Sequence, residues 1–374
     1  MKPIGVGVIG TGFMGKAHSI AYSASASVFG TGLRPNLEIV CDLSPDRASQ
    51  RATDLGFSRY SADWRDVVND SAVDLISVCT PNDTHAEIAI AALNAGKHVW
   101  CEKPMSTNLA DSAAMAAAAK ASTGKTIVGY NYTKNPAVTH ARRLIESGVI
   151  GEVAGFFCRY DVDNEADGNR PWSWRMSRDQ SGTGANGDVL CHVISVAHFL
   201  TGSTISKVVG DYAIVHKERT DPANANATKT VDNDDMVSAL VHFENGVHGH
   251  IGASRVTWGR KCGLRWEVQG TKGTIIFDQE RLNELQLFTK QDDPATDGFR
   301  TILTGPEHAP YAAFLPNGGH SLGYMDVKIC ELHDLLTSIE TGEKIWPDFD
   351  SALVIEQAMD AVDRSVISGA WEKV

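Results

Sequence analysis

The sequence predicts an α/β fold in two parts: an N-terminal doubly wound parallel sheet, then an α+β domain with a large, mostly antiparallel sheet. Three observations predict it. Strands and helices alternate over the first third, strands joined by short turns follow, and a glycine-rich turn links the first strand to the first helix. Because 374 residues are too many for one ordinary domain, we expect two, residues 1–129 and residues 130–374.

The first part alternates short apolar runs with helical segments, as consecutive parallel strands joined by helical crossovers require. Strands are expected at residues 4–9, 37–41, 73–79, 98–101 and 126–130, and helices at 14–26, 47–55, 85–95 and 109–121.

The second part contains runs of β-type sequence separated by tight turns, a pattern typical of antiparallel sheets. Strands are expected at residues 153–160, 207–215, 236–243, 247–254, 264–269, 273–278 and 285–289, and helices at 187–200, 325–340 and 350–368. Residues 293–319 are rich in Pro, Gly and Asp and are expected to form a long loop.

The turn after the first strand reads Gly10-Thr11-Gly12-Phe13-Met14-Gly15. This G-x-G-x-x-G pattern, placed between a strand and a helix, is the dinucleotide-binding fingerprint of a Rossmann domain. Its glycines permit the tight turn, leave room for a pyrophosphate and let the helix pack on the strand. The sequence therefore predicts a bound dinucleotide, and with it redox chemistry.

Asp42 ends the second expected strand, where a carboxylate accepts hydrogen bonds from the adenosine ribose and favours NAD over NADP. It lies farther beyond the glycines than usual, and we interpret the stretch Ser23–Asn36 as an insertion that accounts for this. The alternative for Asp42 is a simple cap on the next turn. Arg47 is near enough in sequence to approach a 2′-phosphate, so NADP stays open as the less favoured cofactor.

Three further loops follow strands at the edge where such sheets bind ligands. Thr80-Pro81-Asn82, with His85 beyond it, is expected to line the cofactor crevice, although a Pro turn with an Asn cap explains the same residues. Glu102-Lys103-Pro104 places a lysine where it can stabilise a developing alkoxide, unless it is one more surface charge. Glu102 and Lys103 are also expected to contact the cofactor. Tyr130 and Asn131 close the last strand, and we expect them at the substrate and the cofactor respectively.

Asp188 and His192 are four residues apart and would share one face of an α-helix. A histidine beside a carboxylate can act as a general acid or base near neutral pH. The alternative is a buried histidine satisfied by its neighbour. The glycine-rich stretch Gly182–Gly187 just before the pair lets the backbone approach a ligand closely.

Two indoles and two guanidiniums crowd the stretch Trp172-Ser173-Trp174-Arg175-Met176-Ser177-Arg178. Indoles cover the C–H faces of a polyhydroxylated ring and guanidiniums donate to its hydroxyls, so Trp174 and Arg178 are candidate substrate-binding residues. Either Trp could instead anchor a loop. His320, in the glycine-rich tip Asn317–His320, could close over a site, or lie in a solvated loop. His248 and His250 share a strand face without an evident third ligand, so no metal site is expected.

The bulk composition restricts partners and location. A net charge of −12 disfavours nucleic acid and anionic membranes. No apolar run is long enough to span a membrane, and no secretory signal is evident. The cysteines are odd in number, 7, and lack C-x-x-C spacing, which is typical of reduced thiols in a cytoplasmic protein.

Four motifs in order make the whole chain resemble the GFO/IDH/MocA oxidoreductase family (glucose–fructose oxidoreductase, inositol dehydrogenase, rhizopine catabolism). They are the glycine loop followed by His18, Thr80-Pro81-Asn82 followed by His85, Glu102-Lys103-Pro104, and the G-x-x-x-D-x-x-x-H segment from Gly184 to His192. The resemblance implies NAD-dependent oxidation of a secondary alcohol, an open-faced second sheet and a homo-oligomer, most often a tetramer.

The same resemblance implies catalytic roles for Lys103, Asp188 and His192. His192 would take the hydroxyl proton, Lys103 would stabilise the alkoxide, and Asp188 would orient His192 or bind an adjacent hydroxyl. Many family members carry an Asp three residues after the histidine, where this chain has Ser195. That departure leaves the substrate open rather than the reaction.

The leading interpretation is NAD-dependent oxidation of a secondary alcohol of a neutral cyclitol or pyranose sugar to the ketone or lactone, as in an inositol dehydrogenase acting on scyllo-inositol. A levoglucosan or other sugar 3-dehydrogenase is the alternative. The Trp-Ser-Trp-Arg segment resembles members acting on inositols or unusual pyranoses, including scyllo-inositol and levoglucosan dehydrogenases and other sugar 3-dehydrogenases. Two other classes stay open: a glycosidase that retains NAD and releases no NADH, and a non-catalytic dinucleotide sensor.

Overall fold

The computed structural model describes residues 1–30 and 32–374; Thr31, inside the stretch interpreted as an insertion, lies outside the described part. The chain forms two compact units, and both are discontinuous. The first unit contains residues 1–134 and 323–353, and the second contains residues 135–322 and 354–374. A single cut after residue 129 does not reproduce these units, because a C-terminal segment returns to the first.

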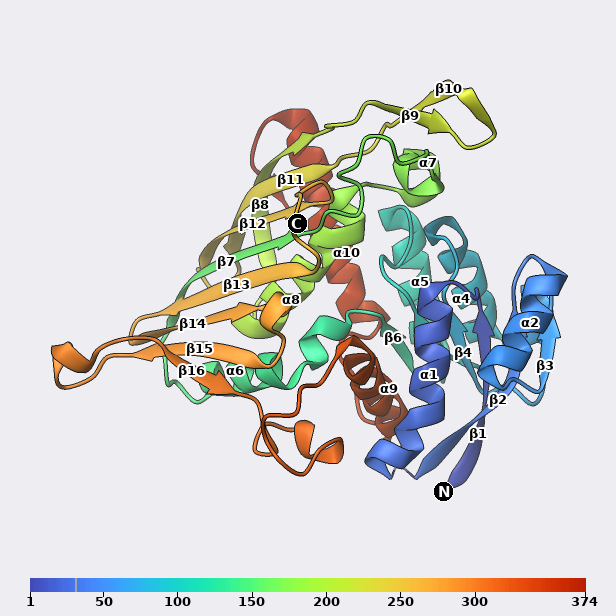
Figure 1. Ribbon diagram of the computed structural model, residues 1–374, viewed down its shortest axis with the longest axis horizontal. Helices are drawn as coiled ribbons and strands as arrows, with labels where there is room; N and C mark the ends of the chain where they lie inside the picture. The colour runs from blue at the N-terminus through green and yellow to red at the C-terminus, as the bar shows by residue number, and fades with distance from the viewer. Residues whose placement is uncertain (31) are drawn as a thin grey trace. The chain divides into compact units, whose positions relative to one another are not determined.

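The described part of the first unit is built on a six-stranded sheet of order β3-β2-β1-β4-β5-β6 (Figure 1). Every neighbouring pair in it is parallel. Its strands are β1 (Lys2–Ile9), β2 (Leu33–Cys41), β3 (Arg59–Ser61), β4 (Leu75–Val78), β5 (His98–Cys101) and β6 (Thr126–Val128). This order is that of a doubly wound Rossmann sheet, as predicted.

Helices cover both faces of this sheet, which explains why its central strands are apolar throughout. The helices are α1 (Phe13–Phe29), α2 (Pro45–Leu55), α3 (Trp64–Val68), α4 (His85–Asn94), α5 (Leu109–Ala121) and α9 (Tyr324–Thr341). α1 packs on α9, and α4 packs on α5 (Figure 1). β4 and β5 are consequently buried on both sides, and their continuous apolar runs are the expected sequence for such strands.

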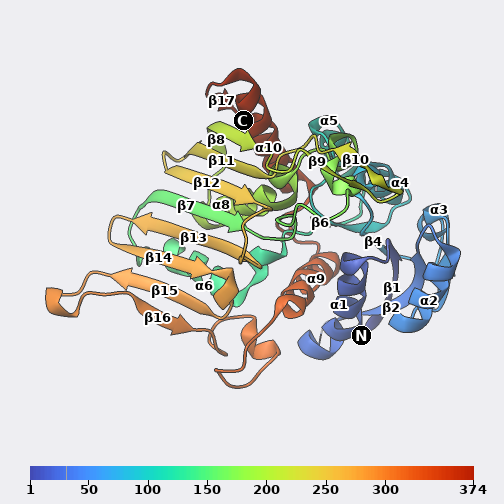
Figure 2. The same cartoon turned by 45° about the horizontal axis from the view of Figure 1, so that its top comes forward.

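The second unit contains, in its described residues, a nine-stranded sheet of order β16-β15-β14-β13-β7-β12-β11-β8-β17 (Figure 2). Its strands are β7 (Val153–Asp161), β8 (Ile205–Ala213), β11 (Met236–Phe243), β12 (His248–Ser254), β13 (Gly263–Gly270), β14 (Gly273–Asp278), β15 (Glu284–Thr289), β16 (Arg300–Leu303) and β17 (Glu372–Lys373). The sheet is mixed rather than fully antiparallel, because β7 and β12 run parallel.

One face of this sheet carries the core of the second unit, and the other presents alternate side chains outward. Helix α8 (Cys191–Thr201) packs on β7 and β12, and α6 (Pro136–Glu146) packs on β14 and β15. Phe157, His250 and Leu240 are directly paired across β7, β12 and β11, so they share the opposite face. Phe157 and Leu240 are 42% and 51% exposed there.

The remaining elements of the second unit are α7 (Arg178–Ser181), most of α10 (Phe349–Ser368), and a separate hairpin of β9 (Glu218–Asp221) and β10 (Asn224–Thr230). The sequence did not predict this hairpin, because its strands are polar and lack alternation. The expected loop 293–319 was wrong in part, since β16 lies inside it and adds an edge strand.

The stretch Ser23–Asn36 lengthens regular elements in its described residues. α1 continues to Phe29, three residues beyond the predicted end, and β2 begins at Leu33. In the described part of the chain, none of the helices combines the length and the apolar character needed to cross a bilayer.

Candidate active site

The glycine loop of the first unit has the geometry that a pyrophosphate requires. Gly10 adopts φ +93°, a left-handed conformation that disfavours side chains, and a Cβ at Gly15 would meet Gly10 O at 1.9 Å. A Cβ at Gly12 would meet nothing within 4 Å, so this position is open to a ligand. No described side chain caps the N-terminus of α1, where Phe13 and Met14 begin the helix. Its first amides therefore suit an anion.

Asp42 lies at the end of β2 and faces this loop. Its carboxylate accepts hydrogen bonds from the hydroxyl and the amide of Thr11 and, at 3.3 Å, from the amide of Ser44. The exposed Arg47 places Nε 3.7 Å from Asp42 Oδ1. The carboxylate therefore fixes Thr11 in the glycine loop, and a guanidinium stands beside it.

His85 connects the two loops that follow β4 and β5. Its Nδ1 lies 2.9 Å from Pro104 O and its Nε2 lies 3.0 Å from Thr80 O. The side chain is fully buried, and burial lowers its pKa. We expected His85 at the cofactor itself, but both ring nitrogens contact backbone. Its position instead joins the Thr80-Pro81-Asn82 loop to the Lys103-Pro104 peptide, which is cis.

Glu102 is also buried, 5% exposed, and belongs to a charge network that includes Lys328 and His18. Its Oε1 lies 2.6 Å from Lys328 Nζ of α9 and 2.9 Å from His18 Nε2. Lys328 also binds Glu331 Oε2 at 2.7 Å, and that oxygen accepts the indole N–H of Trp100 at 3.1 Å. Glu102 was expected to bind cofactor; its carboxylate contacts two buried side chains, Lys328 and His18.

The network distributes charge unevenly between its two carboxyls. Against the effect of burial, Lys328 and His18 hold the pKa of Glu102 well below its usual range. Burial raises the pKa of Glu331 to about 7, with Glu102 adding to the effect and Lys328 opposing it. Burial, together with Lys328, lowers the pKa of His18 to about 4. No sequence motif marks Lys328 or Glu331: the fold brings Lys328 to Glu102, and Glu331 binds Lys328.

Tyr130 and Asn131 follow β6 and are both buried. In the described part of the chain, Asn131 Nδ2 is buried without a hydrogen-bond partner. An orphan donor of this kind suits a polar ligand atom. Together with the open position at Gly12, it makes the residues of the first unit fit a dinucleotide.

Asp188 and His192 lie in the second unit, on two different kinds of helix. Asp188 belongs to a π-helical turn, Asn186–Leu190, and His192 lies in the first turn of α8. The prediction of one regular α-helix was therefore wrong at Asp188, and strict i, i+4 geometry does not apply. π-turns inside helices are often found at functional sites. His192 is 5% exposed and meets the ring of Tyr160 edge-on at 5.9 Å.

The tryptophan–arginine segment divides into an anchor and an exposed part. Trp172 donates its indole N–H to Thr230 O at 3.0 Å, so it anchors the β9–β10 hairpin. Trp174 stacks under the Arg175 guanidinium at 4.4 Å. Arg178 is exposed and pairs with Asp363 at 3.1 Å, which directs its guanidinium toward α10.

Among the other histidines, His320 is exposed, and its carbonyl accepts a hydrogen bond from the buried Tyr311 hydroxyl. That bond pins the loop at the backbone. His248 lies against His242, with ring centroids 3.9 Å apart. The described residues contain no group of three or more potential metal ligands.

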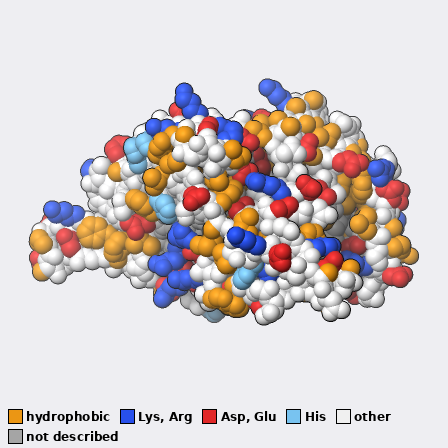
Figure 3. All heavy atoms as spheres, turned by 90° about the horizontal axis from the view of Figure 1, so that it is seen from above, with side chains coloured by type: hydrophobic (Ala, Val, Ile, Leu, Met, Phe, Trp, Pro, Cys, Tyr) orange, Lys and Arg blue, Asp and Glu red, His pale blue; other side chains and the backbone are white. Residues whose placement is uncertain are grey.

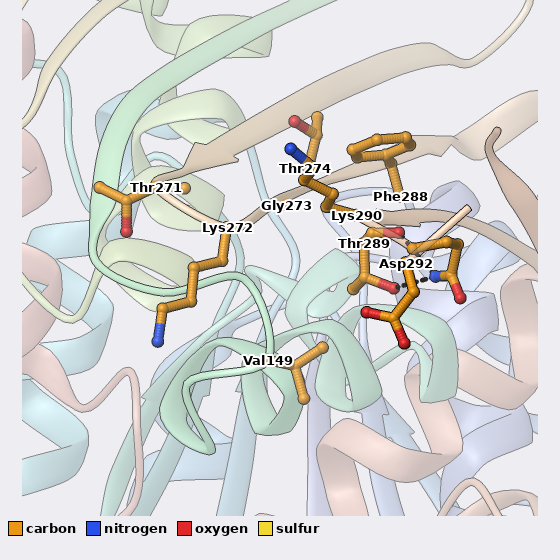
Figure 4. Close-up of a pocket in the computed structure, with 11 residues that line it drawn as sticks. Val149, Thr271, Lys272, Gly273, Thr274, Phe288, Thr289, Lys290 and Asp292 are labelled. Carbon is orange, nitrogen blue, oxygen red and sulfur yellow. Dashed lines mark hydrogen bonds between the residues drawn. The ribbon is translucent and has the colours of Figure 1, made fainter. Parts of the chain in front are cut away.

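A surface pocket of about 810 Å³ opens at the β14–β15 hairpin (Figure 4). Thr271 and Lys272 line one side, and Phe288, Lys290 and Asp292 line the other. None of the predicted site residues lines it. On the face shown in Figure 3, Lys and Arg side chains lie among Asp and Glu side chains.

Comparison with known proteins shows to which family this chain belongs. Residues 4–130 match the model of an oxidoreductase family with an NAD-binding Rossmann fold, and residues 138–276 match the GFO/IDH/MocA C-terminal domain. Over its whole length the chain is 37% identical to levoglucosan dehydrogenase of Pseudarthrobacter phenanthrenivorans, covering 99% of that protein. The chain belongs to the GFO/IDH/MocA family. It is an oxidoreductase with an NAD-binding Rossmann domain.

Solved structures and other family members support the same family assignment. A levoglucosan dehydrogenase in complex with NADH and levoglucosan superposes with a TM-score of 0.96 at 36% identity, with all of both chains covered. The scyllo-inositol 2-dehydrogenase (NAD(+)) of Bacillus subtilis is 29% identical over 72% of this chain and 72% of its own length.

This GFO/IDH/MocA chain departs from the pattern we expected at Ser195. The residue is buried in α8, and its Oγ has no hydrogen-bond partner among the described residues. A hydroxyl at this position therefore does not take over hydrogen bonds that a carboxylate would make.

Proposed function

We propose that this protein uses NAD to oxidise a ring secondary alcohol of a neutral pyranose, with levoglucosan as the best candidate. The observation that carries the proposal is the full-length match to a levoglucosan dehydrogenase, in sequence and in a structure that holds NADH and levoglucosan. An anhydrosugar of this kind has no free anomeric hydroxyl. The product is therefore a ketone.

The first unit supplies the cofactor groups in this proposal. The glycine loop from Gly10 to Gly15 receives the pyrophosphate, and Asp42 accepts from the adenosine ribose. The nicotinamide side is lined by Thr80, Pro81, Asn82 and Asn131. His85 and Glu102 support the loops at this site through their buried contacts. NAD, when bound, supplies the hydride acceptor.

Lys103, Asp188 and His192 carry the chemistry. His192 accepts the hydroxyl proton as the carbon–hydrogen bond breaks and the C=O bond forms. The Lys103 ammonium donates a hydrogen bond to the oxygen as negative charge develops on it. Asp188 orients the imidazole or binds an adjacent hydroxyl. The balance is one proton to His192 and one hydride to NAD for each ketone formed.

Trp174 and Arg178 bind the neutral polyol, and Tyr130 and His320 make further contacts with it. The Trp174 face covers ring C–H groups, and the Arg178 guanidinium, held by Asp363, donates to hydroxyls. The acidic net charge of −12 agrees with a neutral substrate.

A cyclitol such as scyllo-inositol is the second candidate. The similarity to scyllo-inositol 2-dehydrogenase favours it, although that match is weaker and shorter than the match to levoglucosan dehydrogenase.

The test is NADH formation by the purified protein with levoglucosan, scyllo-inositol, myo-inositol and free glucose, each with NAD and with NADP. We expect the highest kcat/KM with levoglucosan and NAD, and NMR of the product identifies the oxidised carbon. Preference for an inositol would overturn the substrate assignment but keep the reaction. No turnover, with NAD retained through purification, would overturn the dehydrogenase and favour the glycosidase or the sensor.

Three further assignments accompany this proposal. Residues 1–129 supply most of the cofactor contacts, and residues 130–374 supply most of the substrate contacts and assemble the oligomer. The exposed sheet face around Phe157 and Leu240 forms the interface of a homotetramer. The free state of all seven cysteines supports a cytoplasmic location.

A further inference from the structure

Asp234, which no motif singles out, receives three consecutive backbone amides of the Gly184–His192 segment. Its carboxylate accepts from the amide of Gly184 at 2.7 Å and from that of Asn186 at 2.8 Å. Its carbonyl accepts from the amide between them, that of Ala185, at 2.8 Å. Asp234 is 2% exposed and lies in the turn before β11. One buried residue thus fixes the backbone just before Asp188.

These amides are the ones that a helix start leaves without internal partners. The π-helical turn and α8 run on continuously from Asn186, and no side chain of their own N-terminus caps them. Asp234 caps them from a distant part of the sequence, and a negative charge at a helix N-terminus is favoured. The cap therefore determines where the helix bearing Asp188 and His192 begins.

The two segments approach each other too closely at Gly184 to leave room for a side chain. A Cβ at Gly184 would lie 1.8 Å from the carbonyl oxygen of Asp234 and 2.7 Å from its amide nitrogen. Only glycine at position 184 permits this approach. The glycine of the motif is thus explained by contact with Asp234.

The neighbouring residue holds the tryptophan–arginine segment in the same way. Asn233 Nδ2 donates to Arg175 O at 2.7 Å and to Ser181 Oγ at 2.8 Å. Arg255, 1% exposed, donates to Arg175 O at 3.1 Å and to Asn233 Oδ1 at 3.0 Å. One buried turn therefore holds both the segment with Trp174 and Arg178 and the segment with Asp188 and His192.

We propose that Asp234 is a positioning residue that sets the geometry of Asp188 and His192 by capping their helix. The role in turnover rests on the proposed function; the capping role does not. An amide at this position offers one oxygen where the carboxylate offers two, so Asp234→Asn loses one of the two side-chain bonds. Asp234→Ala loses both.

The experiment measures kcat and KM for levoglucosan, NADH affinity by fluorescence, and hydrogen exchange of the peptide containing residues 184–186. Variants are Asp234→Asn, Asp234→Ala and Gly184→Ala, which disrupts the contact from the other side without changing a charge. The matched control is Asp348→Asn, because Asp348 accepts the amide of Ser351 at 2.8 Å at the start of α10 and is not in the proposed site.

We expect Asp234→Asn to lower kcat about 100-fold, the scale of a misplacement of about 1 Å. Asp234→Ala should lower it further. NADH affinity should stay within about twofold, because the cofactor groups lie in the other unit, and exchange at residues 184–186 should accelerate. Asp348→Asn should keep the wild-type kcat.

A kcat within threefold of wild type in the presence of accelerated exchange would overturn the positioning role. Unchanged exchange in all three variants would overturn the cap itself. If wild type oxidises none of the sugars or cyclitols, the proposed function fails, and the exchange data still decide the cap. Should the Asp234 variants not fold, Gly184→Ala gives the same two readouts.

Discussion

Asp42 carries two roles at one carboxylate. It holds Thr11 of the glycine loop, and in the proposed function it also accepts from the ribose. Arg47, 3.7 Å away, is the group that would favour a 2′-phosphate once the carboxylate is gone. Cofactor preference therefore depends on which of two adjacent charges faces the ribose.

Asp42→Ala should weaken NADH binding about tenfold, the scale of a lost hydrogen bond to a charged group, while NADPH binding weakens less or improves. Fluorescence titration with both cofactors measures this. Arg47→Ala is the matched control and should affect NADPH more than NADH. Equal losses of both cofactors in Asp42→Ala would contradict the ribose role.

Lys103→Ala should lower kcat by about 10²–10³-fold, the usual effect of removing one donor to a developing oxyanion. NADH affinity should change little, and stopped-flow or steady-state NADH formation measures the turnover. Lys120→Ala, an exposed lysine on α5, is the control. Near-normal turnover in Lys103→Ala would remove the lysine from the mechanism.

Sequence reasoning succeeded for residues whose role is local. The glycine loop was found because its turn, helix start and strand are contiguous. The role of Trp172 as an anchor could not be assigned from the sequence, because it rests on a hydrogen bond to the distant Thr230 O. Lys328 and Asp234 were missed because their partners lie far away in the sequence. Such contacts leave no spacing pattern to read.

At the scale of elements, the same reasoning explains what was predicted and what was not. Strands buried on both faces and amphipathic helices were recognised by their periodicity. The π-turn at Asp188 was not, because one extra residue in a turn leaves the apolar pattern almost unchanged. The polar β9–β10 hairpin was also missed, since its order comes from the indole of Trp172 and from Arg219, which donates to Glu165 O.

We expect the free energy of unfolding to depend on pH through Glu331 of helix α9. Burial raises the pKa of this carboxyl from 4.5 to about 7, so the folded chain holds a proton that the unfolded chain releases between these values. The contribution of Glu331 to the free energy of unfolding is fully present below pH 4.5 and is lost as pH rises through about 7. The size of this effect on the free energy of unfolding is on the order of 3 kcal/mol.

Glu331→Gln keeps the shape and removes this titration, so its Tm relative to wild type should rise between about pH 5 and about pH 8. Thermal unfolding at the two pH values measures the difference. Glu340→Gln, an exposed change on the same helix, should show no such trend. A pH-independent difference for Glu331→Gln would refute the assignment of the titration to this group.

At the scale of the whole molecule, the exposed face of the nine-stranded sheet bears on assembly. Phe157 and Leu240 are paired through His250, which places exposed apolar side chains in one row across three strands. Apolar side chains gathered on a sheet face are typical of an association surface.

Leu240→Asp should shift the proposed tetramer to smaller species, because an unpaired charge buried in an interface costs several kcal/mol. Light scattering after size exclusion measures the mass. Ile367→Asp, at an apolar position 84% exposed on α10, should leave the mass unchanged. A full-size assembly in Leu240→Asp would exclude this face as the interface.

The return of α9 to the first unit has a consequence for biosynthesis. When a ribosome has delivered residues 1–134, the chain has Glu102 and His18 but not Lys328, the cation that the finished protein places 2.6 Å from Glu102. β6 likewise lacks Pro347, whose carbonyl accepts the amide of Val128 at 3.1 Å. A buried carboxylate without its counter-ion is strongly disfavoured. The nascent first unit therefore stays incompletely packed while nearly two hundred further residues are synthesised, and it can complete its folding only after Lys328 and Pro347 have been added.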